Sequence, residues 1–245
     1  MSDRLILAVP SKGRLMQDTL ALFERAGLTI RKIGDERGYR GEIVELPGVD
    51  VSFVSASEIA QFLKTGRVHL GVTGEDLVRE AMFKVAERVQ FLLPLGFGKA
   101  DVVVAVPDCW IDVRRIADIE EMAHTFRRVH GRRIRVATKF TNTTRRFFAT
   151  RGVTSYRIIE SLGATEGAIV AGTAEMIVDI TSTGETLRAN KLRILDDGLI
   201  LPSQANLVAS RTIDWRPAAR EAENEVIRRL ETVVPEAPAE EAGAD

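Results

Sequence analysis

The chain has 245 residues, a formal net charge of −1, an apolar content of 45% and a charged content of 28%. These values exclude disordered and fibrous proteins, and they predict one large α/β unit or two smaller lobes with a packed core. A charge so close to zero gives no long-range attraction for nucleic acid, so no nucleic-acid partner is expected.

The cysteine count and the lengths of the apolar runs exclude further classes of protein. Cys109 is the single cysteine, which precludes an internal disulfide and a cysteine-ligated metal site, and the three histidines are not spaced as ligands. No apolar run is long enough for a signal peptide or a membrane span. We therefore expect a cytoplasmic protein without a membrane partner.

The first expected element is a short apolar strand from Leu5 to Val9. The turn Pro10-Ser11-Lys12-Gly13-Arg14 leads from it into an amphipathic helix that Gly27 ends. Phosphate or pyrophosphate recognition would explain Lys12 and Arg14, because ligands of α/β sheets lie beyond the carboxyl ends of the strands. The alternative is two solvated cations beside a tight turn.

Strands and helices then alternate. Residues 42–54 form a second expected strand and residues 58–64 a helix, and residues 68–73 form a strand that leads into a helix from Gly74. This order predicts a parallel sheet. Glu75 and Asp76 fall in a first helical turn, where an acid needs no ligand because it complements the helix dipole.

The segment Gly96-Phe97-Gly98-Lys99 lies between expected strands at 91–95 and 102–106 and is typical of a crossover between lobes. If the lobes close on a ligand, Lys99 would face it. A surface lysine in a flexible link is the competing explanation.

The second half repeats the plan of strand, polar turn and helix. Residues 108–133 are polar and partly helical, and residues 134–138 and 156–159 form strands, with a helix from Thr143 to Thr150 between them. The next helix opens near Glu166, a first-turn acid for which either the dipole or a ligand accounts. The basic pairs Arg127-Arg128, Arg132-Arg133 and Arg145-Arg146 are interpreted mostly as solvated helix faces.

The most informative stretch is residues 175–190. Met176 to Val178 predict a buried parallel strand that Asp179 closes, and residues 181–186 predict a turn that runs into a helix. A glycine-containing turn offers backbone N–H groups, threonine hydroxyls and a helix N-terminus to an anion. A phosphate monoester fits there, and the Asp179 carboxylate could accept hydrogen bonds from the vicinal hydroxyls of a ribose 5-phosphate. An aspartate cap and a hydroxyl-rich turn are the alternative.

The last segments are expected to return the chain to the first lobe. They are strands at 192–195, 199–200 and 205–209 and an amphipathic helix at 216–233. The acidic residues from 234 to 245 are expected to be disordered. The expected division is therefore lobe I at 1–99 and 186–233, lobe II at 100–185, and a tail at 234–245.

Five segments, in this order along the chain, resemble the ATP phosphoribosyltransferase family, which catalyses the first step of histidine biosynthesis. They read AVPSKGRLMQDTLALFERAGL, HLGVTGEDLVRE, LPLGFGKADVVVAVP, VATKFTNTTRRFFATRG and AEMIVDITSTGETLRANKL. The resemblance implies an α/β fold of two lobes, like type II periplasmic binding proteins, with mainly parallel sheets and an active-site cleft. The length is similar to that of the short form, whose relatives work with a regulatory subunit similar to histidyl-tRNA synthetase in a hetero-oligomer. A homodimer of this chain is also expected.

The resemblance also implies a glycosyl transfer and its site. Adenine N1 of ATP would displace pyrophosphate from phosphoribosyl pyrophosphate, with Mg²⁺ bound mainly to substrate oxygens. The implied catalytic residues are Lys12, Arg14, Lys99 and Asp179, and the implied ATP-binding residues are Lys12, Gly13, Arg14, Asp76 and Leu77. The phosphoribosyl pyrophosphate set is Glu166, Asp179, Thr181, Ser182, Thr183, Gly184, Glu185 and Thr186.

The chain departs from the family pattern at Ser55 and Ser57. The family commonly has an arginine-containing run there, and this chain reads FVSASEI from Phe53. Arg37 or Arg40 is the expected replacement for the missing phosphate contact.

Two other functions fit parts of the pattern. A two-lobed protein that binds a small molecule without catalysis would share the architecture. A Rossmann-type phosphoribosyltransferase would share the loop, although those enzymes usually have two adjacent acids at the strand end, where this chain has Asp179-Ile180.

Overall fold

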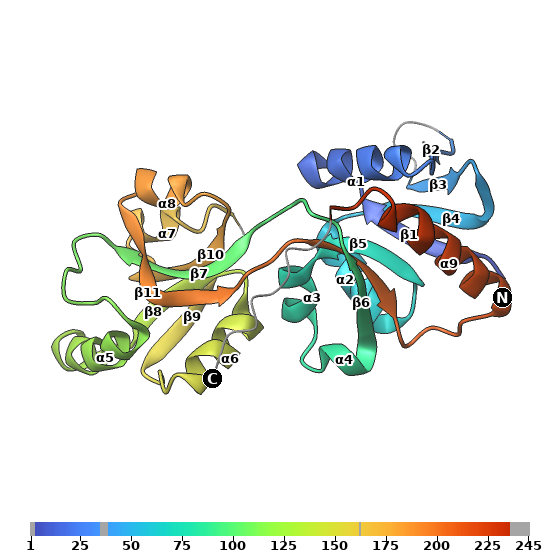
Figure 1. Cartoon of the computed structure of the whole chain (residues 1–245). Coiled ribbons are helices and arrows are strands. Elements are labelled where there is room, and N and C mark those ends of the chain that lie inside the picture. The colour runs from blue at the N-terminus through green and yellow to red at the C-terminus, as the bar shows by residue number, and fades with distance from the viewer. Residues whose placement is uncertain (1–2, 35–38, 162, 236–245) are drawn as a thin grey trace, which may run out of the picture. The chain divides into compact units, whose positions relative to one another are not determined.

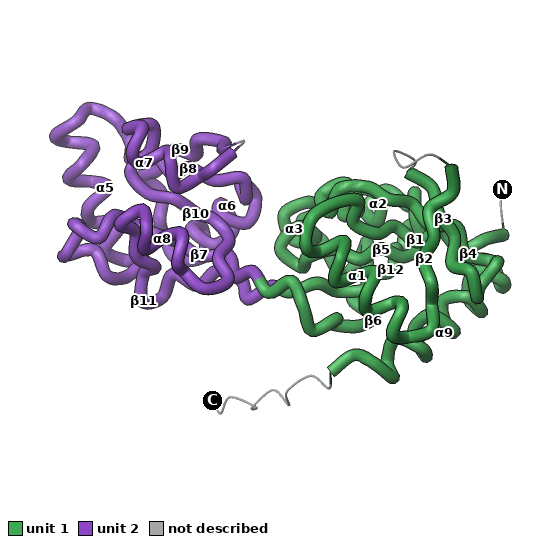
Figure 2. The backbone as a smooth tube through the Cα atoms, turned by 90° about the horizontal axis from the view of Figure 1, so that it is seen from above, with its two compact units in different colours: residues 1–99, 204–245 green, residues 100–203 purple. Residues whose placement is uncertain are grey.

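The structure, a computed structural model, describes residues 3–34, 39–161 and 163–235. It divides the chain into two compact units (Figures 1 and 2). Unit 1 comprises Met1–Lys99 and Gln204–Asp245, and unit 2 comprises Ala100–Ser203. No helix of the described ranges has the length and apolar character needed to cross a membrane.

Unit 1 is built on a seven-stranded sheet of order β2-β3-β4-β1-β5-β12-β6. Its strands are β1 (Leu5–Pro10), β2 (Ile30–Lys32), β3 (Arg40–Ile43), β4 (Leu46–Val54), β5 (Leu70–Gly74), β6 (Val89–Pro94) and β12 (Ala205–Ser210). Its helices within the described residues are α1 (Gly13–Arg25), α2 (Ala56–Thr65), α3 (Glu75–Ala81), α4 (Val85–Arg88) and α9 (Pro217–Glu231).

Helices cover both faces of this sheet. Because successive strand residues point to opposite faces, Leu5, Leu7 and Val9 of β1 pack in one apolar cluster, to which α1 and α9 contribute. Ala8 packs in the other cluster, with residues of α2 and α3. The buried run of β1 is therefore explained by burial on two sides.

Unit 2 has a five-stranded sheet of order β11-β7-β10-β8-β9. Its strands are β7 (Asp101–Pro107), β8 (Ile134–Thr138), β9 (Tyr156–Glu160), β10 (Met176–Thr181) and β11 (Leu192–Leu201), and its described helices are α5 (Ile116–His130), α6 (Thr141–Thr150), α7 (Gly167–Val170) and α8 (Glu185–Ala189). Val103, Ala105 and Ile177 of the sheet pack in one cluster with residues of α7 and α8.

The α/β class is confirmed, but the expectation of mainly parallel sheets is wrong. β1 pairs in parallel with β4 and β5, whereas β12 runs antiparallel to β5 and β6. In unit 2, β10 is parallel to β8 and antiparallel to β7. Both sheets are mixed. β12 and β7, which carry the chain into units 1 and 2, run antiparallel to their neighbours, and β3 does so within a hairpin.

Three segment boundaries differ from the sequence-based expectation. Residues 42–54 contain the end of β3 and all of β4, which form an antiparallel hairpin. Residues 192–201 are one strand, β11, which pairs with β7 of unit 2 across a bulge. The chain therefore returns to unit 1 at Gln204 and not at residue 186, since β11 completes the second sheet.

Val234 packs against the unit 1 core, and the expected disordered tail otherwise falls largely at 236–245, outside the described residues.

Candidate active site

A hollow of about 240 Å³ lies in unit 2 beyond the end of β10. β10 is the middle strand of its sheet, so the turn that follows it begins at a buried, fixed point. The hollow gathers six residues of the predicted phosphoribosyl pyrophosphate set. It is lined by Ala100, Glu166, Asp179, Ile180, Thr181, Ser182, Thr183, Thr186 and Leu187.

The other two predicted residues, Gly184 and Glu185, shape the turn without lining the hollow. Gly184 has a φ of 72°, in the left-handed region that glycine adopts at little cost. A Cβ at this position would lie 2.9 Å from Nη1 of Arg188, so space as well as conformation favours glycine.

Threonine hydroxyls hold the turn together. The Gly184 N–H donates to Oγ1 of Thr181 at 2.8 Å, and the Glu185 N–H donates to Oγ1 of Thr183 at 3.3 Å. Arg188 donates from Nη2 to the Thr183 carbonyl at 3.0 Å. The loop is thus preformed, and the hydroxyls that accept these bonds line the hollow.

Asp179 is placed by its own backbone and by a lysine. Its Oδ1 accepts a hydrogen bond from the Ile180 N–H at 2.8 Å and lies 3.7 Å from Nζ of Lys139. Lys139 follows β8, the parallel neighbour of β10, so the carboxyl ends of both strands meet at one sheet edge. Sequence reasoning missed Lys139. A polar residue directly after the neighbouring parallel strand was the available signal.

Glu166 lies just before α7 and lines the same hollow. Its neighbour Thr165 is fully buried, and Thr165 Oγ1 has no hydrogen-bond partner among the residues that the structure describes. Buried hydroxyls are usually satisfied, so this atom marks an incompletely paired region beside Glu166.

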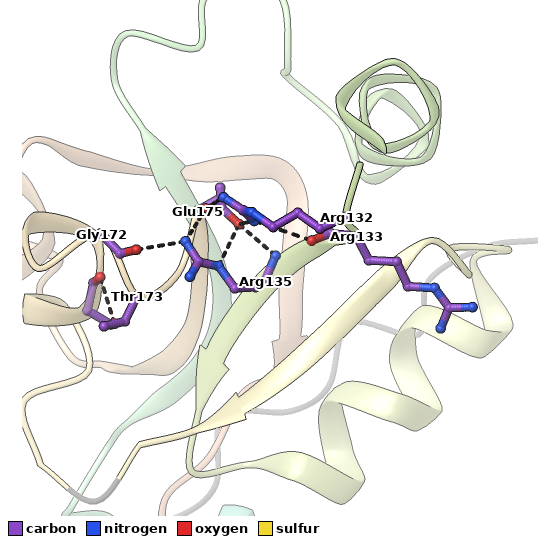
Figure 3. A network of polar contacts seen from close by, with 7 residues as sticks. Arg132, Arg133, Arg135, Gly172, Thr173 and Glu175 are labelled. Carbon is purple, nitrogen blue, oxygen red and sulfur yellow. Dashed lines mark hydrogen bonds and ion pairs between the residues drawn. The ribbon is translucent and has the colours of Figure 1, made fainter. Parts of the chain in front are cut away.

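The start of β10 is anchored by an ion-pair network around Glu175 (Figure 3). Arg132 and Arg135 donate to Glu175 Oε1 at 2.9 and 2.7 Å, and Arg135 also donates to the Gly172 carbonyl at 2.7 Å. Burial raises the pKa of Glu175, but the hydrogen bonds from Arg135 and Arg132 outweigh it and lower that pKa to about 2. The network ties the turn after α7 to β8 and so fixes the strand that leads to Asp179.

In unit 1, three parallel strands end at one edge of the sheet. β1 lies between β4 and β5, and the Ser11 N–H donates to the Val54 carbonyl at 2.9 Å beyond the strand ends. Lys12, Gly13 and Arg14 follow β1 at this edge, and Asp76 and Leu77 follow β5. The adjacency of the strands therefore brings the predicted ATP-binding segments to a common edge.

The side chains at this edge differ in exposure. Lys12 is exposed, and Arg14, whose side chain is 91% exposed, has Nε 3.7 Å from an Asp18 carboxylate oxygen. Asp76 is buried and turned back toward its own helix start, since a Cβ on Gly74 would lie 2.2 Å from its Oδ1. Leu77 packs against the apolar cluster of α2 and α3.

The loop with Lys99 reaches the same part of unit 1. A Cβ at Gly98 would lie 3.1 Å from Cδ1 of Leu15 and 3.4 Å from Cβ of Ala205, which pairs with Gly74. Lys99 is exposed. A second hollow, of about 350 Å³, includes Arg14 but not Lys12 or Lys99; its lining is Arg14, Asp18, Ala21, Leu22, Arg25, Leu95, Gly96, Phe97 and Pro235.

Of the two candidates for the missing arginine, Arg40 is described and Arg37 lies outside the described residues. Arg40 is exposed at the start of β3 and pairs with Ser52, close to the end of β4. Ser55 instead caps α2. Its hydroxyl accepts from the Glu58 N–H at 3.3 Å, and its own N–H donates to Glu58 Oε2 at 3.0 Å.

The family model and the similar sequences point to the same protein family. The model of the HisG family, ATP phosphoribosyltransferase, matches residues 55–232. An ATP phosphoribosyltransferase of Nitrobacter winogradskyi is 61% identical over 221 residues, which are 90% of this chain and 68% of that protein. One from Rhodopseudomonas palustris strain BisB18 is 56% identical over 230 residues, 94% of this chain and 71% of that protein.

Solved structures agree at the level of the fold. A chain of the ATP phosphoribosyl transferase (HisG:HisZ) complex from Thermotoga maritima aligns with a TM-score of 0.68 at 26% identity, over 94% of this chain and 98% of that chain. The arginine-, lysine-, histidine-binding protein ArtJ from Geobacillus stearothermophilus aligns with a TM-score of 0.52 at 12% identity, over 94% and 89%. The second likeness concerns the fold alone.

Proposed function

Because this chain belongs to the ATP phosphoribosyltransferase family, we propose that the hollow beyond β10 binds the ribose 5-phosphate part of phosphoribosyl pyrophosphate. The enzyme joins adenine N1 of ATP to ribose C1 of that substrate, with release of pyrophosphate, in the first step of histidine biosynthesis. Neither a binding protein without catalysis nor a Rossmann-type phosphoribosyltransferase accounts for relatives with this identity.

One observation supports the placement most strongly. The hollow combines the Asp179 carboxylate with the hydroxyls of a preformed turn, including Thr183 and Thr186. Hydroxyls and turn amides suit a phosphate, and a carboxylate suits vicinal sugar hydroxyls. In this proposal the 5-phosphate binds residues 181–186, and Asp179 and Glu166 face the ribose.

The ATP side is proposed for unit 1, at Lys12, Gly13, Arg14, Asp76 and Leu77. The support is that β1 and β5 are adjacent and parallel, so the segments after them share an edge. Because Asp76 is buried and Leu77 is packed, we assign their contribution to the shape of the edge and the charge contacts to Lys12 and Arg14.

The proposed chemistry needs no general base, because adenine N1 is already a nucleophile. The barrier lies in the departure of pyrophosphate and in the positive charge that develops on the ribose. Lys12, Arg14 and Lys99 are proposed to neutralise the pyrophosphate, and the Asp179 carboxylate is proposed to stabilise the oxocarbenium-like sugar.

Mg²⁺ is the proposed metal, and it would neutralise charge on the pyrophosphate oxygens. Among the described residues no group of three or more histidine, cysteine, aspartate or glutamate side chains could hold a metal ion. The proposal is that Mg²⁺ binds mainly substrate oxygens and water, with the carboxylates of Asp179 and Glu166 nearby.

The proposed assembly is a homodimer of this chain within a hetero-oligomer that contains a regulatory subunit similar to histidyl-tRNA synthetase. The likeness to a chain of the Thermotoga maritima HisG:HisZ complex, over 98% of that chain, supports such a partner. A cytoplasmic location, without nucleic acid or membrane as partner, completes the proposal.

The test of the site compares Asp179→Ala and the double variant Thr183→Val, Thr186→Val with the wild type. Pyrophosphate release is measured with ATP, hypoxanthine or orotate as the acceptor. We expect pyrophosphate release only when ATP is the acceptor. In both site variants, kcat/KM for phosphoribosyl pyrophosphate should fall more than about tenfold. Thr150→Val is the matched control, because Thr150 is exposed on α6 and, among the described residues, its hydroxyl donates only to the Phe147 carbonyl. Wild-type kinetics in the site variants, with circular dichroism unchanged, would reject the assignment.

A further inference from the structure

A separate hollow of about 490 Å³ lies in unit 2 along β9. Tyr156, Arg157 and Ile158 of β9 line it, together with Arg145 of α6 and with Arg133. It shares no lining residue with the hollow at Asp179. Successive strand residues point to opposite faces of a sheet, so a hollow that touches three of them in a row lies along the edge of the strand.

That edge carries backbone groups that point away from the sheet. β9 is the last strand of its sheet and pairs only with β8 in the part of the chain that the structure describes. The Ser161 N–H donates to the Thr138 carbonyl of β8 at 3.0 Å. Because backbone groups alternate in direction along a strand, those of Tyr156 and Ile158 then point to the open side. Proteins usually cover or charge such an edge.

The hollow is also strongly cationic. Within the described residues, Arg133, Arg145 and Arg157 form no ion pair with a carboxylate, whereas Arg132 and Arg135 are both paired with Glu175. Figure 3 shows the Arg133 side chain extending away from the Glu175 network. Three unneutralised guanidinium groups around one hollow repel each other and attract anionic groups.

Between the charges the surface is partly apolar. Tyr156 and Ile158 are half-buried, and Tyr156 packs edge-on against Phe148 of α6 with ring centroids 5.0 Å apart. The nearby acid Glu120 is already engaged, since it accepts from the N–H and the hydroxyl of Thr154. The hollow thus has a partly apolar lining with arginines around it, and the residues that line it do not neutralise the arginine charges.

We propose that the open edge of β9 binds an extended acidic segment of a partner polypeptide as an additional strand. A small phosphorylated molecule could neutralise the arginines, but it would leave the outward N–H and carbonyl groups of β9 unpaired. An extended chain pairs these groups, and its acidic side chains meet Arg133, Arg145 and Arg157. The proposal does not depend on the assignment of the substrate site, because the two hollows are distinct.

The test uses the full chain and a short fluorescein-labelled peptide rich in glutamate and valine, with fluorescence anisotropy as the readout. We expect saturable binding to the wild type and a loss of affinity of roughly tenfold in the double variant Arg145→Gln, Arg157→Gln. The matched control is Arg127→Gln, Arg128→Gln, which removes two exposed arginines of α5 and should leave the affinity unchanged. Pyrophosphate release with ATP should stay at the wild-type rate in both variants.

A second probe separates strand addition from simple charge attraction. The same peptide with alternate N-methylated residues keeps its charge but loses the N–H groups that a strand needs. We expect its binding to fall at least as far as in the arginine variant. Equal binding of both peptides, equal loss in the control variant, or no binding to the wild type would overturn the proposal.

Discussion

Gly184 shows how a single residue shapes the proposed phosphate loop. Its backbone has a φ of 72°, and a Cβ there would meet the Arg188 guanidinium at 2.9 Å. We expect Gly184→Ala to raise the KM for phosphoribosyl pyrophosphate severalfold, because strain of about 1 kcal/mol would shift the turn that Thr181 and Thr183 hold. Steady-state kinetics provide the measurement.

The control for this change is Gly48→Ala. Gly48 has no positive φ and no atom within 4 Å of an added Cβ. We expect its kinetics to match the wild type. If Gly184→Ala behaves in the same way, the shape of the turn does not matter for substrate binding.

The ionisation of Glu175 makes the stability of the fold depend on pH. Its side chain is 14% exposed, and hydrogen bonds from Arg135 and Arg132 overcome the effect of burial and hold its pKa at about 2, against 4.5 ordinarily. A lowered carboxylate pKa stabilises the fold above the unfolded-state pKa, and this contribution is lost as the pH falls from about 4.5 to about 2. We expect Glu175→Gln to destabilise the protein at neutral pH by up to about 3 kcal/mol and to flatten the acid limb.

The measurement is thermal unfolding as a function of pH for the wild type and the variant. Glu225→Gln is the control, because Glu225 pairs with Arg228 and Arg229 on its own helix in a more solvated setting. Its substitution should have the smaller effect. An unchanged acid limb in Glu175→Gln would contradict the role given to the network.

At the scale of the element, the start of α2 can be tested by removal of its cap. The Ser55 hydroxyl accepts from the Glu58 N–H, and the Glu58 carboxylate accepts from the Ser55 N–H at 3.0 Å. We expect Ser55→Ala to cost about 1 kcal/mol of stability. Urea unfolding measures this loss, with Ser57→Ala as the comparison, because among the described residues the Ser57 hydroxyl has a hydrogen bond only with the Ser55 hydroxyl, at 3.3 Å. Equal effects of the two changes would show that the cap is unimportant.

Sequence patterns predicted most elements, because apolar periodicity and glycine stops act locally. The helix from Gly13 to Arg25 and the strand from Leu5 to Pro10 are examples. The direction of a strand in its sheet and the strand that it pairs with depend on residues far away in the sequence. The sequence of β11, LRILDDGLIL, predicts two short strands, and only the pairing with β7 joins them into one strand of unit 2.

The candidate site, too, could be predicted only where its residues are close together in the sequence. Asp179 and the threonines of the turn are contiguous in sequence, so their common hollow could be predicted. Lys139 reaches Asp179 from another strand at 3.7 Å, and the parallel pairing of β8 with β10 brings it there. The sequence shows a polar residue directly after β8, but it does not show that β8 is the neighbour of β10.

At the scale of the whole molecule, the division into units is itself a prediction about folding. Unit 2 is one continuous stretch, Ala100–Ser203, with its own sheet and apolar core. We expect a polypeptide of residues 100–203 to fold alone, since a domain with its own core can do so. Circular dichroism and a cooperative thermal transition provide the measurement, and a noncooperative, unfolded fragment would contradict it.

The central claim is that the ribose 5-phosphate binds at the end of β10. A crystal structure of the full chain with phosphoribosyl pyrophosphate tests it most directly. The account predicts the 5-phosphate on residues 181–186 and the ribose hydroxyls within hydrogen-bond distance of Asp179. A ribose phosphate bound elsewhere, with this turn free of ligand, would contradict it.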